Sequence, residues 1–405
     1  IWDKWTRIAL VKRILVGLIL GAILGIAVPQ ATGIAILGDV FVSALKAIAP
    51  LLVFFLVISS LCNAGKSHGG VIKTVIILYM FSTVLAAVIA VFASMAFPVK
   101  MTLANAATDT SAPQGIVEVL NNLLLNVVAN PVSSLVNANY VGILMWAVLL
   151  GLAFRAADKM TKKVLADVAD GISMVVTWII NLAPFGIFGL VFNTVSTNGL
   201  DIFTTYGKLL LLLVGCMLFI YFVTNPLLVY WCIRQNPYPL IFHCLKRSAL
   251  TAFFTRSSAA NIPVNMKVCE EMGLDRDTYS VTIPLGATIN MDGAAITITV
   301  MTMATAFTLG IHVDIPTAII LSLLAALSAC GASGVAGGSL LLIPMACSLF
   351  GISDDISMQV VAVGFIIGVV QDSVETALNS SSDLLLSASA EFRQWRLEGK
   401  EIKFK

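Results

Sequence analysis

Five polar side chains near the C-terminal end of the chain are spaced so that they would share one face of a helix. Their offsets are i, i+3, i+4, i+7 and i+11, which form a single stripe at about 100° per residue. The five are Asp372, Glu375, Thr376, Asn379 and Asp383. Apolar residues precede and follow the stripe, at 360–370 and 384–386. Carboxylates inside a membrane need a partner, so the stripe indicates a substrate or ion site; an exposed cytoplasmic extension of the helix is the alternative.

A second polar interruption lies at 284–293, which reads PLGATINMDG within another apolar segment. Gly286 weakens the helical hydrogen-bond ladder and thereby frees carbonyl oxygens, and Thr288, Asn290 and Asp292 add oxygen atoms of their own. Hard cations such as Na⁺ prefer several oxygen ligands, and broken membrane helices supply them. A kink retained for packing would explain the proline and glycines but not Asp292. The segment therefore predicts a cation site.

The segment 254–258 (FTRSS) carries a cation and two hydroxyls in a third apolar region. Ser257 and Ser258 could offer hydroxyls and helix-terminal amides to a carboxylate. Arg256 requires an anion if it is buried, and Asp372 or Glu375 is the expected partner. An intramembrane enzyme with a serine nucleophile is disfavoured, because the nearest histidine in sequence, His243, falls at the predicted membrane edge.

A polar group also occurs in an earlier apolar segment. It consists of Tyr79, Ser82 and Thr83. Hydroxyl residues in membrane helices are more often hydrogen-bonded to their own backbone than used as ligands. From the residues alone, both interpretations stay open.

The composition sets the protein class. Of 405 residues, 59% are hydrophobic and 11% are charged, whereas soluble domains carry about 25% charged residues. This indicates a polytopic membrane protein with room for about eight to ten spans. The net charge of +2 gives no indication of nucleic-acid binding. The seven scattered cysteines have no CxxC spacing, and we interpret them as apolar packing residues.

Charge distribution orients the predicted helices. The cations at 1–13 and at 155–163 mark cytoplasmic segments, and both termini are expected in the cytoplasm. Helices are expected at about 14–28, 39–62, 71–97, 164–197 and 203–233. The interval 116–154 contains many asparagines and predicts broken helical pieces.

The last part of the chain repeats one plan twice. Two apolar segments have polar or glycine-rich centres and arms too short to span a membrane, at 238–270 and 315–350. Each is followed by a helix, at 277–309 and 353–392. Non-helical backbone at membrane depth must be buried in protein or line a cavity, so we expect two re-entrant hairpins. Such repeats place transporter sites near the membrane midplane.

Four motifs in this order resemble the dicarboxylate/amino acid:cation symporter family, which has the glutamate and neutral amino acid transporter fold. They are 254–258 (FTRSS), 290–293 (NMDG), the tip 331–338 (GASGVAGG) and 371–383 (QDSVETALNSSSD). Within the family, the chain is most similar to the bacterial sodium-coupled serine/threonine symporters. The resemblance implies an all-α membrane protein with eight transmembrane helices, two re-entrant hairpins, and scaffold and transport subdomains.

The resemblance also implies a division of labour along the chain. Residues 1–236 would form the scaffold and trimerisation helices, with the third and sixth helices flanking the core. Residues 237–392 would form the transport core, and 393–405 a cytoplasmic tail. A homotrimer in the bacterial inner membrane, surrounded by lipid, would work by an elevator mechanism. Na⁺ would be the coupling ion, with no other cofactor.

By resemblance, the substrate would contact Ser257, Ser258, Val335, Asp372, Glu375, Thr376 and Asn379. Asp372 would hold its ammonium group, and Asn379 with Ser258 its α-carboxylate. One Na⁺ site would use Gly286, Asn290, Asn379 and Asp383. A second would use Thr288 with backbone carbonyls of Ala329, Cys330 and Ala332. A third would use Tyr79, Ser82, Thr83, Asn290 and Asp292.

Departures from the family pattern indicate the substrate. Members that carry acidic substrates have an arginine where this chain has Glu375, and a glutamate there would repel a side-chain carboxylate. Ala294 replaces a pocket threonine, and Ala336 replaces a proline of the second tip. We therefore expect a Na⁺-coupled importer of serine and threonine. A channel of the same fold and an acidic amino acid or dicarboxylate symporter are the alternatives.

Overall fold

The structure is a computed structural model, and every regular element in the part of the chain it describes is a helix. It describes all residues except 1–7, 9, 64–69, 104–123, 126, 138, 200, 250–251, 254–255, 331, 333–336 and 403–405. Three helices among the described residues are long and apolar enough to cross a membrane: Gly70–Ala96, Thr204–Ile233 and Asp354–Leu397. These features are those of an all-helical, multi-pass membrane protein.

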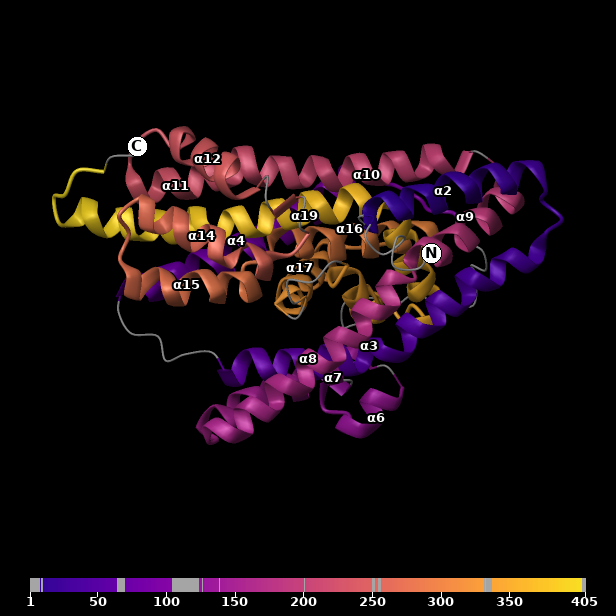
Figure 1. The fold of residues 1–405 in the computed structure, drawn as a ribbon, viewed down its shortest axis with the longest axis horizontal. Helices are drawn as coiled ribbons and strands as arrows, with labels where there is room; N and C mark the ends of the chain where they lie inside the picture. Colours follow the sequence, from indigo (N-terminus) through magenta and orange to yellow (C-terminus); the bar gives the residue numbers. More distant parts are fainter. Residues whose placement is uncertain are drawn as a thin grey trace.

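One set of helices comes from the first half of the chain and runs along the lower and right-hand sides of Figure 1. It comprises α2 (Leu10–Ala27), α3 (Ile36–Asn63), α6 (Pro131–Val136), α7 (Tyr140–Ala153), α8 (Lys159–Asn181) and α9 (Ala183–Asn198). α2 packs along α9, and α3 packs against α7, α8 and α9. Glycines let α2 and α9 approach closely: a Cβ at Gly17 would lie 2.3 Å from the Pro184 carbonyl oxygen.

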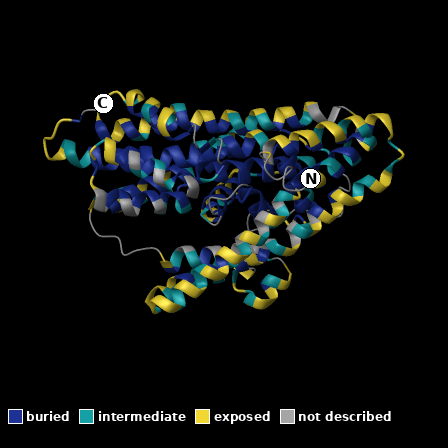
Figure 2. Cartoon of the chain, in the orientation of Figure 1, coloured by how far each residue is buried: buried dark blue, intermediate teal, exposed yellow. Residues whose placement is uncertain are grey.

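A second set contains the helices of the C-terminal half together with one earlier helix. It comprises α4 (Gly70–Ala96), α10 (Asp201–Phe219), α11 (Asn225–Ile233), α12 (Tyr238–Cys244), α14 (Ser258–Glu271), α15 (Arg276–Ile289), α16 (Asp292–Thr308), α17 (Ile315–Ala329), α18 (Ile343–Ser348) and α19 (Asp354–Leu397). α4 packs against α16, α17 and α19, and α10 and α11 pack against α19. Buried residues concentrate in this set, around α16 and α19 (Figure 2).

Two predicted helices are interrupted. The helix expected at 164–197 is two helices, α8 and α9, because Pro184 stands in the first turn of α9 and lacks an amide hydrogen for the preceding turn. The helix expected at 203–233 contains a π-helical turn, Ile220–Thr224, followed by Pro226 at the start of α11. The interval 131–153 consists of the two pieces α6 and α7, so the prediction of broken helices is correct for its described residues.

Contacts join the two arms of the first predicted hairpin. Asn261 on α14 donates to the Ser248 hydroxyl across the hairpin at 3.0 Å and to the Ser380 hydroxyl of α19 at 2.8 Å. Asn265, one turn further along α14, donates to the Ser380 carbonyl at 2.8 Å. In the second predicted hairpin, α17 contacts α18 and the short 3₁₀ turn Ser339–Leu342. Asn261 of the first hairpin and the 3₁₀ turn of the second both contact α19.

α19 is the longest element and lies at the centre of this set (Figure 1). It begins at a capping serine, Ser353, whose hydroxyl accepts the Ile356 amide at 3.4 Å. It ends at Leu397, beyond the expected end at 392. Leu378 and Leu384, which lie off the polar stripe, are 3% and 0% exposed. The helix is therefore buried over most of its surface at the level of the carboxylates, while Val370 on one face is 42% exposed.

Candidate functional site

The polar stripe of α19 is buried. Asp372, Glu375, Thr376, Asn379 and Asp383 are between 1% and 6% exposed. Such burial contradicts the alternative of an exposed helical extension. Buried carboxylates require charged or hydrogen-bonding partners, and the partners that the fold provides divide the stripe into two clusters.

Asp372 is paired with Arg256, one of the two partners expected from the sequence. The guanidinium Nε of Arg256 donates to Asp372 Oδ2 at 2.6 Å, and its second nitrogen lies 2.5 Å from the same oxygen. The other carboxylate oxygen accepts the Gly337 amide at 3.1 Å. Arg256 precedes α14 with a left-handed φ of 52°, which is rare for a residue with a side chain. A side chain of the first predicted tip and a backbone amide of the second thus converge on Asp372.

Glu375 is held by three neutral donors. Its Oε2 accepts from the Thr297 hydroxyl at 2.7 Å, the Ser339 hydroxyl at 2.9 Å and the Gln371 amide at 2.5 Å. These donors come from α16, the second hairpin and α19 itself. Thr297 and Ser339 were not predicted from the sequence. The position of Gln371, four residues before Glu375 on one helix face, was a signal for its role.

Thr376 and Asn379, the other two stripe residues predicted to contact substrate, hydrogen-bond to backbone groups of the protein. The Thr376 hydroxyl donates to the Asp372 carbonyl at 2.8 Å, one turn back along α19. Asn379 Oδ1 accepts the Gly293 amide at 2.7 Å, and its Nδ2 lies 3.4 Å from the Met291 sulfur. Asn379 therefore connects the stripe directly to the break between α15 and α16.

We call Arg256, Asp372, Glu375, Gly337 and Ser339 the hairpin-tip cluster. Ser258 begins α14 and is 3% exposed, and Ser257 is partly buried. Both serines directly follow Arg256, which contacts Asp372, so they lie beside this cluster. Val335 and Ala336, predicted in the second tip, lie outside the described residues.

The second cluster forms around Asp292 at the first turn of α16. The Ser82 hydroxyl donates to Asp292 Oδ2 at 2.7 Å, and the Thr83 hydroxyl donates to Oδ1 at 3.1 Å. Asp292, Ser82 and Thr83 are all fully buried. The fold thus brings together the α4 hydroxyls and Asp292, which the sequence separates by about two hundred residues. Their grouping matches the third predicted set.

Asn290, two residues before Asp292, hydrogen-bonds to the C-terminal end of the polar stripe of α19. Its Nδ2 donates to Asp383 Oδ1 and to the Ser382 hydroxyl, both at 2.8 Å. Its Oδ1 is buried and has no hydrogen-bond partner. The Tyr79 hydroxyl donates to the Asp383 carbonyl at 2.9 Å. We call Tyr79, Ser82, Thr83, Asn290, Asp292 and Asp383 the Asp292 cluster.

Gly286 permits the close contact between α15 and α19. A Cβ at this position would lie 2.8 Å from Asp383 Cγ and 2.9 Å from the Tyr79 hydroxyl oxygen. Any side chain here would displace Asp383. The glycine is therefore required by packing, in addition to its predicted role in loosening the helix. The Gly286 carbonyl still accepts the Asn290 amide at 2.9 Å.

Asn225 also belongs to this region, although it was not predicted from the sequence. It follows the π-helical turn of the sixth predicted helix and is fully buried. Its Oδ1 lies 3.5 Å from the Ser82 hydroxyl, and its Nδ2 has no partner. A π turn often marks a functional site because it rotates the following residues out of helical register. The Asn–Pro sequence at 225–226, within an apolar segment, could have indicated this polar site from the sequence.

The set predicted around Thr288 is brought together only in part. The Thr288 hydroxyl donates to the Leu285 carbonyl of its own helix at 2.7 Å. Cys330, at the end of α17, lies beside the end of α15, with its sulfur 3.8 Å from the Ile289 carbonyl oxygen. The Ala329 carbonyl accepts the Ala332 amide at 2.9 Å. The residues adjoin, but in this arrangement Thr288 and Ala329 are engaged locally.

Charge is balanced differently in the two clusters. Asp372 has the Arg256 guanidinium, whereas none of the described lysines or arginines pairs with Asp292 or Asp383. Two buried carboxylates, an unpartnered amide oxygen and neutral hydroxyls constitute an oxygen-rich set that lacks a cation. This donor set fits a hard monovalent cation such as Na⁺.

Comparisons with known proteins cover nearly the whole chain. A family model for the sodium:dicarboxylate symporter family matches residues 10–391. The chain is 58% identical over 401 residues to the serine/threonine transporter SstT of Bifidobacterium adolescentis, covering 99% of this chain and 93% of that protein. It is 56% identical over 395 residues to the serine/threonine transporter SstT of Streptococcus thermophilus, covering 97% of this chain and 98% of that protein.

Proposed function

Because the chain belongs to the sodium:dicarboxylate symporter family, whose members are transporters and not enzymes, we propose that it imports serine and threonine together with Na⁺. The names of its relatives support this substrate class. One structural observation supports the coupling to Na⁺ most directly: the Asp292 cluster contains two carboxylates and an unpartnered oxygen, Asn290 Oδ1, without a described cation.

Substrate recognition would centre on Asp372. Its carboxylate already receives a cation, Arg256, at the position where the ammonium group of an amino acid is expected. Binding would exchange one charge-assisted hydrogen bond for another, so the buried carboxylate keeps a partner throughout. Asn379 and Ser258 are proposed to hold the α-carboxylate, and Thr376 to line the pocket.

Selectivity would come from Glu375. Its carboxylate accepts hydroxyl donors in this structure, from Thr297 and Ser339. A serine or threonine hydroxyl offers the same chemistry and could take the place of one of them. The side-chain carboxylate of aspartate would meet like charge in a site of low polarity, which disfavours an acidic substrate.

Coupling would run through Asn290 and Asn379. Asn290 holds Asp383 through Nδ2 and leaves Oδ1 for an ion. Asn379 holds the Gly293 amide and stands one helical turn from Thr376 on the substrate stripe. Na⁺ bound among Gly286, Asn290, Asn379 and Asp383 would therefore fix the substrate side chains. We place a second Na⁺ at Thr288, Ala329, Cys330 and Ala332, and a third at the Asp292 cluster.

The transport movement is proposed to be of the elevator type. α15–α19 with α12 and α14 would move as a core, carrying α4, α10 and α11, which pack on it. α2, α3 and α7–α9 would form the stationary scaffold of a homotrimer in the bacterial inner membrane, with eight transmembrane helices, two re-entrant hairpins and cytoplasmic termini. The predicted boundary at residue 236 is thus kept, except that α4, α10 and α11, which precede it, would move with the core.

The test is uptake of labelled serine by the purified full chain in liposomes. We expect saturable uptake with an inward Na⁺ gradient, and loss of uptake when choline replaces Na⁺. Threonine should compete, and aspartate should not. Uptake that persists in choline would contradict the proposed function. Single-channel currents without substrate would favour the channel alternative, and preferential aspartate uptake the acidic-substrate alternative.

A further inference from the structure

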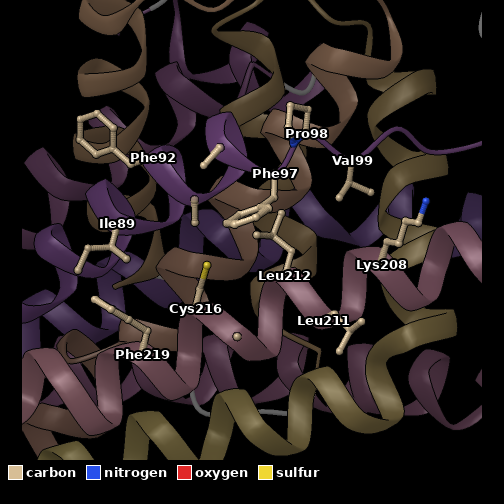
Figure 3. Close-up of a pocket in the computed structure, with 13 residues that line it drawn as sticks. Ile89, Phe92, Phe97, Pro98, Val99, Lys208, Leu211, Leu212, Cys216 and Phe219 are labelled. Atoms are coloured by element: carbon tan, nitrogen blue, oxygen red, sulfur yellow. The ribbon is translucent and has the colours of Figure 1, made fainter.

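A groove lies between α4 and α10, apart from both clusters. Its volume is about 920 Å³. The lining residues are Ile89, Phe92, Ala93, Ala96, Phe97, Pro98, Val99, Lys208, Leu211, Leu212, Gly215, Cys216 and Phe219. Lys208 is the one charged side chain among them, and Figure 3 shows it at one end with the aromatic and aliphatic side chains beyond it. None of the lining residues belongs to the hairpin-tip or Asp292 cluster.

The apolar walls of the groove are open to the surroundings. Phe97 is 69% exposed, Leu211 75% and Phe219 47%. In a membrane these side chains face acyl chains, not water. Lys208 is exposed as well, and it pairs with no described residue. A lysine at such a position extends its ammonium group toward the headgroup layer while its stem lies on apolar surface.

The length of the groove matches one leaflet. Lys208 and Phe219 are eleven positions apart on α10, which is about 16 Å at the helical rise. Half of a hydrocarbon core of about 30 Å is about 15 Å. A cation at the polar end and an apolar channel of one acyl-chain length are complementary to a lipid with an anionic headgroup. Lys100 directly follows the lining residue Val99 in the sequence and contributes a second positive charge next to the groove.

We propose that this groove is a binding site for one anionic phospholipid. Its phosphate lies against Lys208, and one acyl chain runs between α4 and α10 toward Phe219. The lipid occupies the space between the helix that carries Ser82 and Thr83 and the helix that leads to Asn225. The proposal does not depend on which amino acid the protein carries.

Gly215 provides a way to fill the groove without disturbing the protein. It lines the groove, and a Cβ built there meets nothing within 4 Å. Gly207, on the same helix, is equally open but does not line the groove. Gly215→Phe and Gly207→Phe therefore form a matched pair: both place a large side chain on one helix, but only the first obstructs the acyl chain.

The experiment is lipid binding by native mass spectrometry on the detergent-purified full chain. The probes are phosphatidylglycerol and phosphatidylcholine with identical acyl chains. We expect the unmodified protein to prefer phosphatidylglycerol, and Lys208→Gln to reduce that preference about fivefold. Lys208→Arg should retain it. Gly215→Phe should weaken binding of both lipids about tenfold, through the loss of about two buried methylenes, while Gly207→Phe should not.

Stabilisation by Na⁺ against thermal unfolding shows which variants are folded before they are compared. The proposal is overturned if Lys208→Gln keeps the full headgroup preference, or if Gly215→Phe and Gly207→Phe bind lipid equally. Loss of oligomers from Gly215→Phe with unchanged lipid binding would assign the groove to a second copy of the chain, and would also overturn it.

Discussion

The hairpin-tip cluster and the Asp292 cluster both include carboxylates of α19, but only the first pairs one of its carboxylates with a described cation. In the first, Asp372 receives the Arg256 guanidinium and a backbone amide from the second tip. In the second, Asp292 and Asp383 receive only hydroxyl and amide donors, and Asn290 Oδ1 receives nothing. The hairpin-tip cluster contains a cation, Arg256, whereas the Asp292 cluster contains none among the described residues.

This difference indicates what each cluster binds. A buried carboxylate that already has a cation can exchange it for the ammonium group of a substrate. A buried pair of carboxylates with neutral donors is expensive in a site of low polarity until a cation arrives. The first cluster therefore suits an amino acid, and the second suits an alkali metal ion. Four substitutions test this contrast, from the largest expected effect to the smallest.

Asp372→Asn should produce the largest loss. The substrate ammonium would lose its counter-charge and Arg256 would remain buried without an anion, so serine affinity should fall about 100-fold or more. Equilibrium binding of labelled serine measures this. Stabilisation of the variant by Na⁺ should persist, because the Asp292 cluster is untouched. Serine affinity within threefold of the unmodified protein would break the assignment of this cluster to substrate.

Asp292→Asn should act on Na⁺ first. Loss of about 2 kcal/mol of charge interaction would raise the Na⁺ concentration for half-maximal serine binding about 30-fold. The serine affinity at saturating Na⁺ should change little. Asp314→Asn is the control, because this carboxylate caps α17, where it accepts the Thr317 amide at 2.9 Å, and contacts neither cluster. An equal Na⁺ response in the two variants would contradict a cation site at Asp292.

Glu375→Arg should change the selectivity of the hairpin-tip cluster. Asp372 is already paired with Arg256, so a second arginine would lack an anion and could recruit the side-chain carboxylate of aspartate. We expect the ratio of aspartate to serine uptake to rise about tenfold. Glu375→Gln, which removes charge without adding it, is the control and should raise the ratio less. An unchanged ratio in Glu375→Arg would remove Glu375 from the account of selectivity.

Asn225→Ala should have the smallest effect. Asn225 does not contact Asp292 but lies 3.5 Å from the Ser82 hydroxyl, which does. Its loss should raise the Na⁺ requirement about threefold, through the orientation of Ser82, with serine affinity at high Na⁺ unchanged. Thr224→Val, at the adjacent buried position, serves as the packing control. No difference between the two variants would restrict Asn225 to a structural role.

The sequence predicted the contents of both clusters better than their contacts. The stripe from Asp372 to Asp383 follows from helical periodicity, and Arg256 requires an anion wherever it is buried. Periodicity does not reveal which donors face a carboxylate from other helices, so Thr297, Ser339 and Asn225 were missed. The interruption of 164–197 at Pro184 was also missed, because apolar composition continues across it.

Residue types and spacing alone determined that this chain is a helical membrane protein, that α19 carries an acidic stripe, and that 284–293 breaks a helix. These are local properties of composition and period. Only the tertiary structure decided that Arg256 pairs with Asp372 and not with Glu375, that Ser82 and Thr83 meet Asp292, and that Gly286 lies against Asp383. Those pairings depend on how close separate helices approach, and helix packing sets that distance.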